Sequence, residues 1–357
     1  MKVLILTFLC SVNFMASAYA QKVMLPEKGA YFGAYVDAGP LAEEVRPHEI
    51  EAFELLTGKP MAWVYFSNNW TDGEIDFPYE NVEICRKMGR IPYIRLMPWS
   101  EDSGDGKADP IFTMDAFLKG TFDEKLIEWA RQASESPGPI ILEFGPEVNG
   151  NWFPWNGQWN GGSRTTRYGD PRLPDGPEKF RDVYRRIITL FKIGGLTEAT
   201  WVLHVDTARM PEASWNSTSN YYPGDENIDW IGLSVFGAQL PTHDWIEFMP
   251  KFKSFWPEIQ EIAKRKPVII SEFAVIEDKK NPSRKADWIA RALRTIESGL
   301  YPIKGISYWN SPGWLADGSA DFRITSSEKA LNSFVGRINQ DFWKIITAPI
   351  QPSEDEQ

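Results

Sequence analysis

Two glutamates stand out because each follows a run of apolar residues that is typical of a buried strand. Glu147 lies shortly after the run 139–142, and Glu272 closes the run 267–271. Two carboxyl groups that face each other across a cavity can cleave a glycosidic bond, one donating a proton and the other attacking the sugar. A single glutamate would more simply form an ion pair with an arginine such as Arg95, so the interpretation depends on the pair.

Tryptophans lie close to these glutamates in the sequence. The flat face of an indole stacks on the C–H face of a pyranose ring, and an amide near a glutamate can orient it or bind a sugar hydroxyl. For the segment 151–164, rich in Trp, Gly and Asn, the alternative is a packed lid over the rim. We favour the wall of a sugar-binding cleft. The candidate substrate-binding residues in and around these segments are Asn149, Trp152, Trp155, Trp159 and Trp309.

Two further apolar runs lead to His204 and Phe236, which we also count as candidate substrate-binding residues. His204 and the nearby Asp206 raise the possibility of a metal site or a catalytic triad. The chain has 3 histidines, and none of the others lies near His204 in the sequence. Zinc sites usually combine several His or Cys ligands, so we predict no metal and no cofactor.

Strand-like and helix-like segments alternate along the chain. Strands are expected over 31–36, 61–66, 91–96, 139–144, 199–204, 230–235, 267–271 and 303–309. Helices are expected over 48–56, 79–88, 123–132, 178–193, 245–264, 285–296 and 326–338, with a long loop after the fifth strand.

Eight such repeats predict an α/β protein, a single (β/α)8 TIM barrel, in which catalytic groups lie at the C-terminal ends of the strands. Glu147 and Glu272 would then follow strands four and seven, on roughly opposite sides of the barrel mouth. A doubly wound open sheet is the alternative, but no G-x-G-x-x-G motif follows any strand.

The two ends of the sequence differ in composition from the rest. A charged start, an apolar stretch over 3–9 and the small residues of 18–20 are typical of a secretory signal peptide. We therefore expect an exported protein, extracellular or periplasmic. The expected division is a signal peptide at 1–20, one catalytic domain at 21–347 and a disordered acidic tail at 348–357.

Charge and cysteine content exclude several classes of protein. The net charge of −11 argues against nucleic acids and anionic membranes as partners, since both attract basic surfaces. Removal of the signal peptide would take Cys10 with it and leave Cys85 as the only thiol, so no internal disulfide is expected. We expect a monomer held together by its core.

Several motifs resemble glycoside hydrolase family 26, the β-mannanase-like barrels, over nearly the whole chain. The segment 147–155, Glu-Val-Asn-Gly-Asn-Trp-Phe-Pro-Trp, resembles the family motif E-M-N-G-x-W-x-P-W, and 271–273 resembles the strand with the nucleophile. Further matches, each weaker but in the right order, are 33–37, 88–92, 120–123, 221–232 and 321–324.

This resemblance implies that Glu147 is the general acid/base, that Glu272 is the nucleophile and that Trp309 is the stacking platform under the cleaved sugar. Two positions depart from the pattern of the family mannanases. Pro146 stands where they usually carry a histidine, and Phe236 stands where they carry a tyrosine able to hydrogen-bond the nucleophile. Both departures affect polar contacts around the sugar, whereas both carboxyl groups remain.

The resulting prediction is a secreted retaining endo-β-glycosidase with a polysaccharide substrate, β-1,4-mannan first. Pro146 and Phe236 keep β-1,3- or mixed-linkage glucan and β-1,3-xylan open as alternatives. The same departures also allow a carbohydrate-binding barrel with weakened catalysis. An enzyme acting on an exopolysaccharide of its own organism would share the chemistry but not the substrate.

Overall fold

The computed structural model describes residues 22–37, 39, 42–100, 106–136, 138–313, 315 and 318–346. The predicted signal peptide and acidic tail lie outside these residues. Within them, eight parallel strands close into a barrel, with a ninth short strand added outside β1. The strands are β1 (Ala30–Val36), β2 (Trp63–Asn69), β3 (Ile91–Met97), β4 (Ile141–Phe144), β5 (Thr200–Asp206), β6 (Trp230–Ser234), β7 (Val268–Phe273), β8 (Ile303–Asn310) and β9 (Trp343–Lys344).

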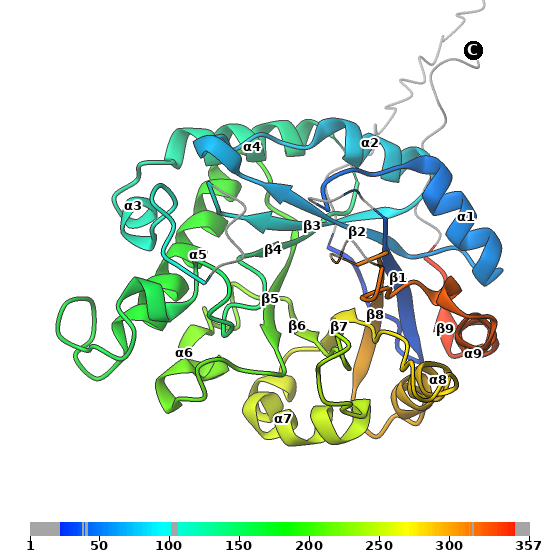
Figure 1. Ribbon diagram of the computed structural model, residues 1–357. Helices are drawn as coiled ribbons and strands as arrows, with labels where there is room; N and C mark the ends of the chain where they lie inside the picture. The colour runs from blue at the N-terminus through cyan, green and yellow to red at the C-terminus, as the bar shows by residue number, and fades with distance from the viewer. Residues whose placement is uncertain are drawn as a thin grey trace, which may run out of the picture.

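The order β2-β3-β4-β5-β6-β7-β8-β1, with β1 also paired to β2, confirms the predicted (β/α)8 barrel. The helices form a ring around the strands (Figure 1). The helices are α1 (Pro47–Thr57), α2 (Tyr79–Lys87), α3 (Met114–Leu118), α4 (Asp123–Glu135), α5 (Asp175–Ile193), α6 (Thr218–Tyr221), α7 (Phe248–Ala263), α8 (Arg284–Glu297) and α9 (Glu328–Ile338). Four short 3-10 helices, η1 to η4, lie in the connections.

Most of the predicted elements are confirmed, with shifts at their ends. The segment after β5, expected to be a long loop, contains the 3-10 helix η3 (Ser214–Asn216) and the single turn α6. The short elements α3 and β9 were not expected. Helix α5 begins at Asp175 rather than at residue 178. Pro177 is tolerated in its first turn because the amides there make no intrahelical hydrogen bond.

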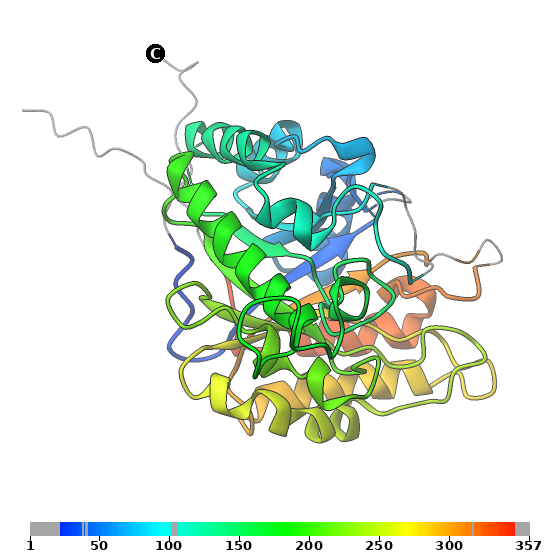
Figure 2. The same cartoon turned by 90° about the vertical axis from the view of Figure 1, so that its left-hand side faces the viewer.

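Helix α5 shows why the surrounding helices pack on the sheet. Apolar residues at helical spacing bury one face, and Phe180, Tyr184, Ile187 and Phe191 are all fully buried. The helix crosses the near side of the barrel in Figure 2.

Among the described residues, no helix has the length and apolar character needed to cross a membrane.

The barrel interior is filled by large aromatic side chains rather than by a channel. Trp63 lies at its centre, where its indole nitrogen donates to Ser307 Oγ at 2.8 Å. A Cβ at Gly33 would lie 2.2 Å from the Trp63 ring, and one at Gly305 would lie 2.5 Å from it. Glycine at both positions therefore makes room for the indole of Trp63.

Candidate active site

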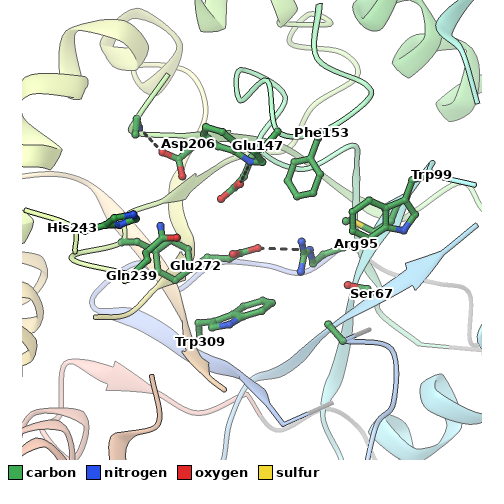
Figure 3. Close-up of a pocket in the computed structure, with 15 residues that line it drawn as sticks. Ser67, Arg95, Trp99, Glu147, Phe153, Asp206, Gln239, His243, Glu272 and Trp309 are labelled. Carbon is green, nitrogen blue, oxygen red and sulfur yellow. Dashed lines mark hydrogen bonds and ion pairs between the residues drawn. The ribbon is translucent and has the colours of Figure 1, made fainter. Parts of the chain in front are cut away.

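A cavity of about 490 Å³ opens at the C-terminal ends of the barrel strands (Figure 3). This is the end of a (β/α)8 barrel at which catalytic groups gather. Both predicted catalytic glutamates project into it, with Glu147 above Glu272 in the view of Figure 3. The described side chains that line it are Ala42, Ser67, Arg95, Met97, Trp99, Glu147, Trp152, Phe153, Asp206, Ala208, Phe236, Gln239, His243, Glu272 and Trp309.

Glu147 lies in the loop after β4 and is held by the tryptophan loop that follows it. Its carboxylate oxygen Oε2 accepts a hydrogen bond of 2.8 Å from the indole nitrogen of Trp152. A Cβ at Gly150 would lie 2.2 Å from that indole, so glycine permits the close approach of the ring. Pro146, at the preceding position, has no side-chain donor, whereas Trp152 donates to Glu147.

We predict that Trp152→Phe lowers kcat on polysaccharide by about 10-fold or more, since a hydrogen bond to a charged group contributes about 1.5–3 kcal/mol. The phenyl ring keeps most of the apolar contact but has no N–H donor. The measurement is initial rate against substrate concentration, with Trp256→Phe on the outer helix α7 as the matched control. An unchanged kcat in Trp152→Phe would show that this hydrogen bond does not support Glu147.

An irregularity in β7 brings Glu272 into the barrel mouth. Leu233 and Ser234 of β6 pair with Ile270 and Glu272, so Ser271 is an extra residue in the register. Such a bulge breaks the alternation of side chains along a strand. As a result, Ser271 and Glu272, although adjacent, both contact residues of the barrel interior: Ser271 Oγ lies 2.8 Å from Tyr93 and Glu272 Oε1 lies 2.9 Å from Tyr65.

The surroundings of Glu272 hold both a cation and a hydroxyl group. Arg95 Nε lies 3.6 Å from Glu272 Oε1, so an arginine pairs with this glutamate within the site. Phe236, just after β6, has no hydroxyl, and the hydroxyl of Tyr65 on β2 lies 2.9 Å from Glu272 Oε1. Burial raises the pKa of Glu272 to about 7, against the lowering effect of Arg95 and with a further rise from the charge of Glu147.

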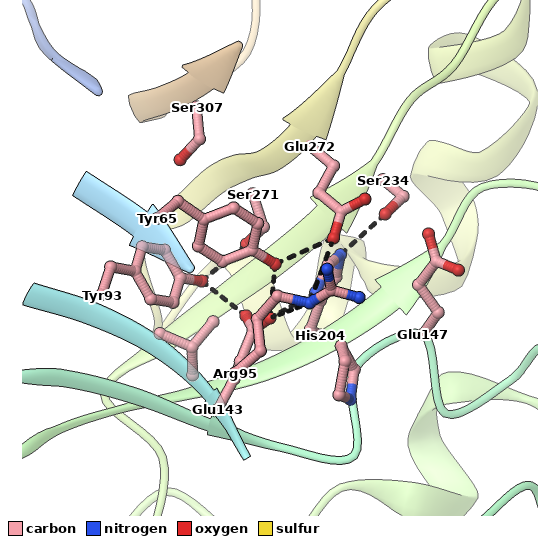
Figure 4. Close-up of polar contacts among 12 residues, drawn as sticks. Tyr65, Tyr93, Arg95, Glu143, Glu147, His204, Ser234, Ser271, Glu272 and Ser307 are labelled. Carbon is pink, nitrogen blue, oxygen red and sulfur yellow. Dashed lines mark hydrogen bonds and ion pairs between the residues drawn. The ribbon is translucent and has the colours of Figure 1, made fainter. Parts of the chain in front are cut away.

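Beneath Glu272 lies a polar network centred on Glu143, a fully buried carboxylate of β4 (Figure 4). Glu143 accepts hydrogen bonds from Tyr65 at 2.5 Å and from Tyr93 at 2.7 Å, and its Oε1 lies 3.1 Å from His204 Nδ1. Burial alone would raise the pKa of Glu143, but His204 and the two tyrosine hydroxyls lower it below its usual value. Burial lowers the pKa of His204, and Glu143 more than reverses that effect. The two residues therefore stabilise each other's charged forms.

Asp206, at the end of β5, is a third carboxyl group in the cavity. It is 3 % exposed, and its backbone and that of the Glu147 loop are joined through the side chain of Asn149. Burial raises the pKa of Asp206 to about 7, and the neighbouring charge of Glu147 adds to the rise, whereas Lys251 opposes it. Asp206 is therefore a carboxyl group next to Glu147 that titrates close to neutral pH.

We predict that Asp206→Asn makes the folded protein less sensitive to alkaline pH. A carboxyl with a pKa of about 7 when folded and about 3.9 when unfolded binds more protons in the native state between these values, so stability falls as pH rises through that window. Asparagine removes this loss. The melting temperature of the variant minus that of the parent should therefore be higher at pH 8 than at pH 5. Asp341→Asn, at an exposed position, is the matched control, and equal differences at both pH values would contradict the expectation.

The aromatic walls of the cavity come from several strands. Trp309 of β8 stacks on Tyr35 of β1, with ring centroids 4.0 Å apart and planes 8° apart. The guanidinium of Arg95 lies over the Trp309 ring at 5.3 Å. Trp309 is thus held flat on one side of the cavity, opposite Glu147 (Figure 3). A rigid, flat ring in this place offers a surface on which a sugar ring can stack.

Of the nine candidate site residues, the cavity lining contains Glu147, Trp152, Phe236, Glu272 and Trp309. The other four are not part of this lining. Trp155 is fully buried because its ring stacks on Phe153, and its indole donates to Pro146 O. Asn149 is fully buried and bonds to the backbone of Asp206, Trp159 donates to Asn151 O, and His204 is 1 % exposed beneath Glu272.

Sequence reasoning gave no role to Tyr65, Tyr93 or Glu143. All three lie inside strands, where the apolar runs drew attention to burial rather than to chemistry. A carboxylate within a run such as 139–144 was the available signal, because a buried charge needs partners from neighbouring strands. The loop after β6 also contributes Gln239 and His243 to the cavity, and no sequence pattern pointed to them.

Glu143, His204 and Glu272 place possible metal-ligand atoms within 4.8 Å of one another. Arg95 Nε already lies 3.6 Å from Glu272 Oε1 and 4.0 Å from Glu143 Oε1. His204 also contacts Ser234 Oγ at 2.8 Å through Nε2. We therefore interpret the cluster as an ion-paired hydrogen-bond network whose cation is an arginine.

Comparison with curated proteins gives distant relatives in larger polypeptides. Endoglucanase H of Acetivibrio thermocellus is 25 % identical over 313 residues, which cover 86 % of this chain and 30 % of that protein. A beta-1,3-xylanase of an Alcaligenes species is 24 % identical over 217 residues, 54 % of this chain and 39 % of that protein. The chain thus spans well under half the length of these relatives.

Solved structures with the same fold include family 26 mannanases. The catalytic domain of an endo-beta-1,4-mannanase from Bacillus sp. JAMB-750 superposes with a TM-score of 0.62 at 15 % identity, covering 89 % of this chain and 87 % of that one. A beta-mannanase from Bacteroides ovatus superposes with a TM-score of 0.60 at 14 % identity, covering 89 % and 94 %. The model of glycosyl hydrolase family 26 matches residues 114–290, which include both glutamates. The protein belongs to glycosyl hydrolase family 26.

Proposed function

We propose that this protein is a retaining endo-β-glycosidase that hydrolyses a β-linked polysaccharide by a two-glutamate double displacement. The observation that supports this most directly is the projection of Glu147 and Glu272 into one cavity whose floor is the ring of Trp309. Family membership supports the same chemistry. The proposal assigns the proton donor and base to Glu147 and the nucleophile to Glu272.

The reaction would begin with a sugar stacked on Trp309 and its glycosidic oxygen near Glu147. Glu147 donates its proton to that oxygen as Glu272 attacks C1, which breaks the C1–O bond and forms a glycosyl ester on Glu272. Glu147, now ionised, removes a proton from water as the water attacks C1. The C1–Glu272 bond then breaks, and both carboxyl groups return to their starting states.

The protein surroundings suit these two roles. Trp152 fixes Oε2 of Glu147 with a donor, and the carboxyl group of Asp206 lies next to Glu147. Among the described residues, the hydrogen bond and the ion pair to the Glu272 side chain both reach Oε1, so Oε2 is available for attack on C1.

β-1,4-mannan stays our first substrate prediction. The comparisons also leave β-1,3- or mixed-linkage glucan and β-1,3-xylan as alternatives. The structural neighbours are mannanases at 14–15 % identity, whereas the curated relatives with 24–25 % identity are named an endoglucanase and a beta-1,3-xylanase. Phe236 in the lining and Pro146 beside Glu147 also distinguish this site from the mannanase pattern.

The deciding experiment is incubation of the purified protein with β-1,4-mannan, mixed-linkage β-glucan, β-1,3-glucan and β-1,3-xylan, followed by reducing-end and product-size analysis. We expect one of them to give oligosaccharides with retained β-configuration, visible by NMR in the first minutes. Tight binding of an oligosaccharide without hydrolysis over days would select the carbohydrate-binding barrel instead.

Export also stays a proposal, supported by the residue pattern of the first twenty positions. Expression of the full sequence with its native start should yield a mature protein beginning at Gln21 outside the cytoplasm. N-terminal sequencing of the fractionated cells tests this. A protein that retains its first residues in the cytoplasmic fraction would contradict it.

A further inference from the structure

The contacts of Tyr65 require more hydrogens than its hydroxyl supplies. Tyr65 Oη lies 2.5 Å from Glu143 Oε1 and 2.9 Å from Glu272 Oε1 (Figure 4). A phenol donates one hydrogen bond. If both carboxyl groups were ionised, one carboxylate oxygen would face the lone pairs of the phenol oxygen with no hydrogen between them. Both contacts are satisfied together when one of the two carboxyl groups carries a proton.

The other contacts of Glu143 and Glu272 indicate which of the two carboxyl groups carries the proton. Glu143 accepts from Tyr93 at Oε2 and lies 3.1 Å from His204 Nδ1 at Oε1, in addition to its contact with Tyr65. These three contacts satisfy it as an anion. Glu272 has a single arginine at 3.6 Å. The proton therefore belongs to Glu272 in the resting site, where Glu272 donates to Tyr65 and Tyr65 donates to Glu143.

We infer that the Tyr65 hydroxyl hydrogen alternates between Glu143 and Glu272 in step with the charge on Glu272. Tyr65 is thereby a positioning residue that donates to the nucleophile only while the nucleophile is ionised. This inference rests on the proposed function, since it takes Glu272 as the nucleophile. No covalent bond of Tyr65 breaks at any stage: its O–H turns about the bond between ring carbon and oxygen.

The alternation follows the proposed reaction. Glu272 first loses its proton to solvent through the cavity, and Tyr65 turns its O–H from Glu143 to Glu272 Oε1. When Glu272 becomes an uncharged ester, Tyr65 returns to Glu143. When the C1–Glu272 bond breaks and the carboxylate re-forms, Tyr65 turns back. Glu143 keeps Tyr93 and His204 throughout, so it tolerates the temporary loss of one donor.

Such a donor stabilises charge at the moment when it develops, which favours the transition states over the uncharged ester. A fixed donor that bound all states equally would not change the rate in this way. The titratable or charged groups that face Glu272 from the surrounding elements are Tyr65 of β2, Tyr93 and Arg95 of β3, Glu143 of β4, Glu147 of the next loop and His204 of β5. Of these, Tyr65 is the one that hydrogen-bonds both carboxyl groups.

The test is the pH dependence of kcat/KM in Tyr65→Phe, with Tyr93→Phe as the matched control. Tyr93 loses the same hydroxyl from Glu143 but donates nothing to Glu272. We expect Tyr65→Phe to shift the acid limb of kcat/KM upward by about one to two pH units and to lower its plateau about 10- to 100-fold. The shift in Tyr93→Phe should be much smaller. Equal shifts in both variants, or none in Tyr65→Phe, would overturn the inference.

Glu143→Gln provides a second variant with the opposite expectation. The amide competes less strongly for the Tyr65 hydrogen, so the acid limb should move to lower pH. In the double variant with Tyr65→Phe this change should shrink, because there is no hydrogen left to share. Strict additivity of the two shifts in such a cycle would contradict a shared hydrogen.

Titration of the Glu272 carboxyl by 13C NMR follows the same shifts without turnover, with Glu272→Gln to assign the resonance. If the parent hydrolyses none of the polysaccharides but its Glu272 titration still rises in Tyr65→Phe, the proposed function fails and the hydrogen sharing stands. If the parent is active and neither variant moves the titration, Tyr65 is only a packing residue.

Discussion

Glu272→Ala is expected to lower kcat on the polysaccharide substrate by at least about 10⁴-fold, because removal of a nucleophile eliminates the covalent route. The fold should survive. The alanine removes a buried carboxyl whose pKa is raised to about 7, and Arg95 still has Glu143 Oε1 at 4.0 Å as a counter-charge. The measurement is initial rate by reducing-end analysis, together with circular dichroism and melting temperature.

The matched control is Glu261→Ala, a glutamate of α7 whose side chain is 70 % exposed and pairs with Lys264. It should keep the parental rate. Azide adds a chemical test, since a small anion can occupy the space left by the Glu272 side chain and attack C1 from the same side. An activated aryl β-glycoside should then give the α-glycosyl azide. A near-parental rate in Glu272→Ala would show that the nucleophile is misassigned.

Glu147→Ala is expected to lower kcat on polysaccharide about 10²- to 10⁴-fold, the range for loss of a general acid/base. The loss should depend on the leaving group. A dinitrophenyl glycoside departs without proton donation, so its first step should be nearly as fast as in the parent, with a burst of phenol as the ester accumulates. Azide should then accelerate turnover and yield the β-glycosyl azide.

The opposite configurations of the two azide products separate the roles of Glu147 and Glu272 within one set of reagents. Asp206→Ala serves as a comparison for Glu147→Ala, because it removes the carboxyl beside Glu147 from the same cavity wall. If Glu147→Ala slowed polysaccharide and dinitrophenyl glycoside equally, Glu147 would not be the acid. If Asp206→Ala slowed only the polysaccharide, the acid would be Asp206.

Periodicity and strand-end position were enough to predict the barrel and the placement of Glu147 and Glu272 on its mouth. Both signals are local: apolar runs mark the strands, and a parallel barrel gathers the residues that follow them. The same reasoning did not predict the burial of Trp155, since an indole near a glutamate in the sequence can equally turn into the core. Its burial depends on Phe153, whose position a local pattern does not determine.

The network around Glu143 was beyond local patterns for a different reason. Tyr65 and Glu143 are separated by 78 residues and meet only because β2 and β4 both flank β3. The bulge that presents Glu272 depends on the pairing of β7 with both of its neighbours. The contact between Tyr65 of β2 and Glu272 of β7 therefore becomes visible only when the strands are assembled.

The backbone of Glu147 has a φ of +51°, in the left-handed region that glycine adopts more readily than glutamate. Glycine at this position would relieve conformational strain of about 1–2 kcal/mol. A barrel that served only as a scaffold would have no need of a glutamate in this backbone conformation. The side chain that we assign to proton transfer is therefore carried by a strained backbone. At this one position, the residue that the reaction needs is not the residue that the backbone conformation favours.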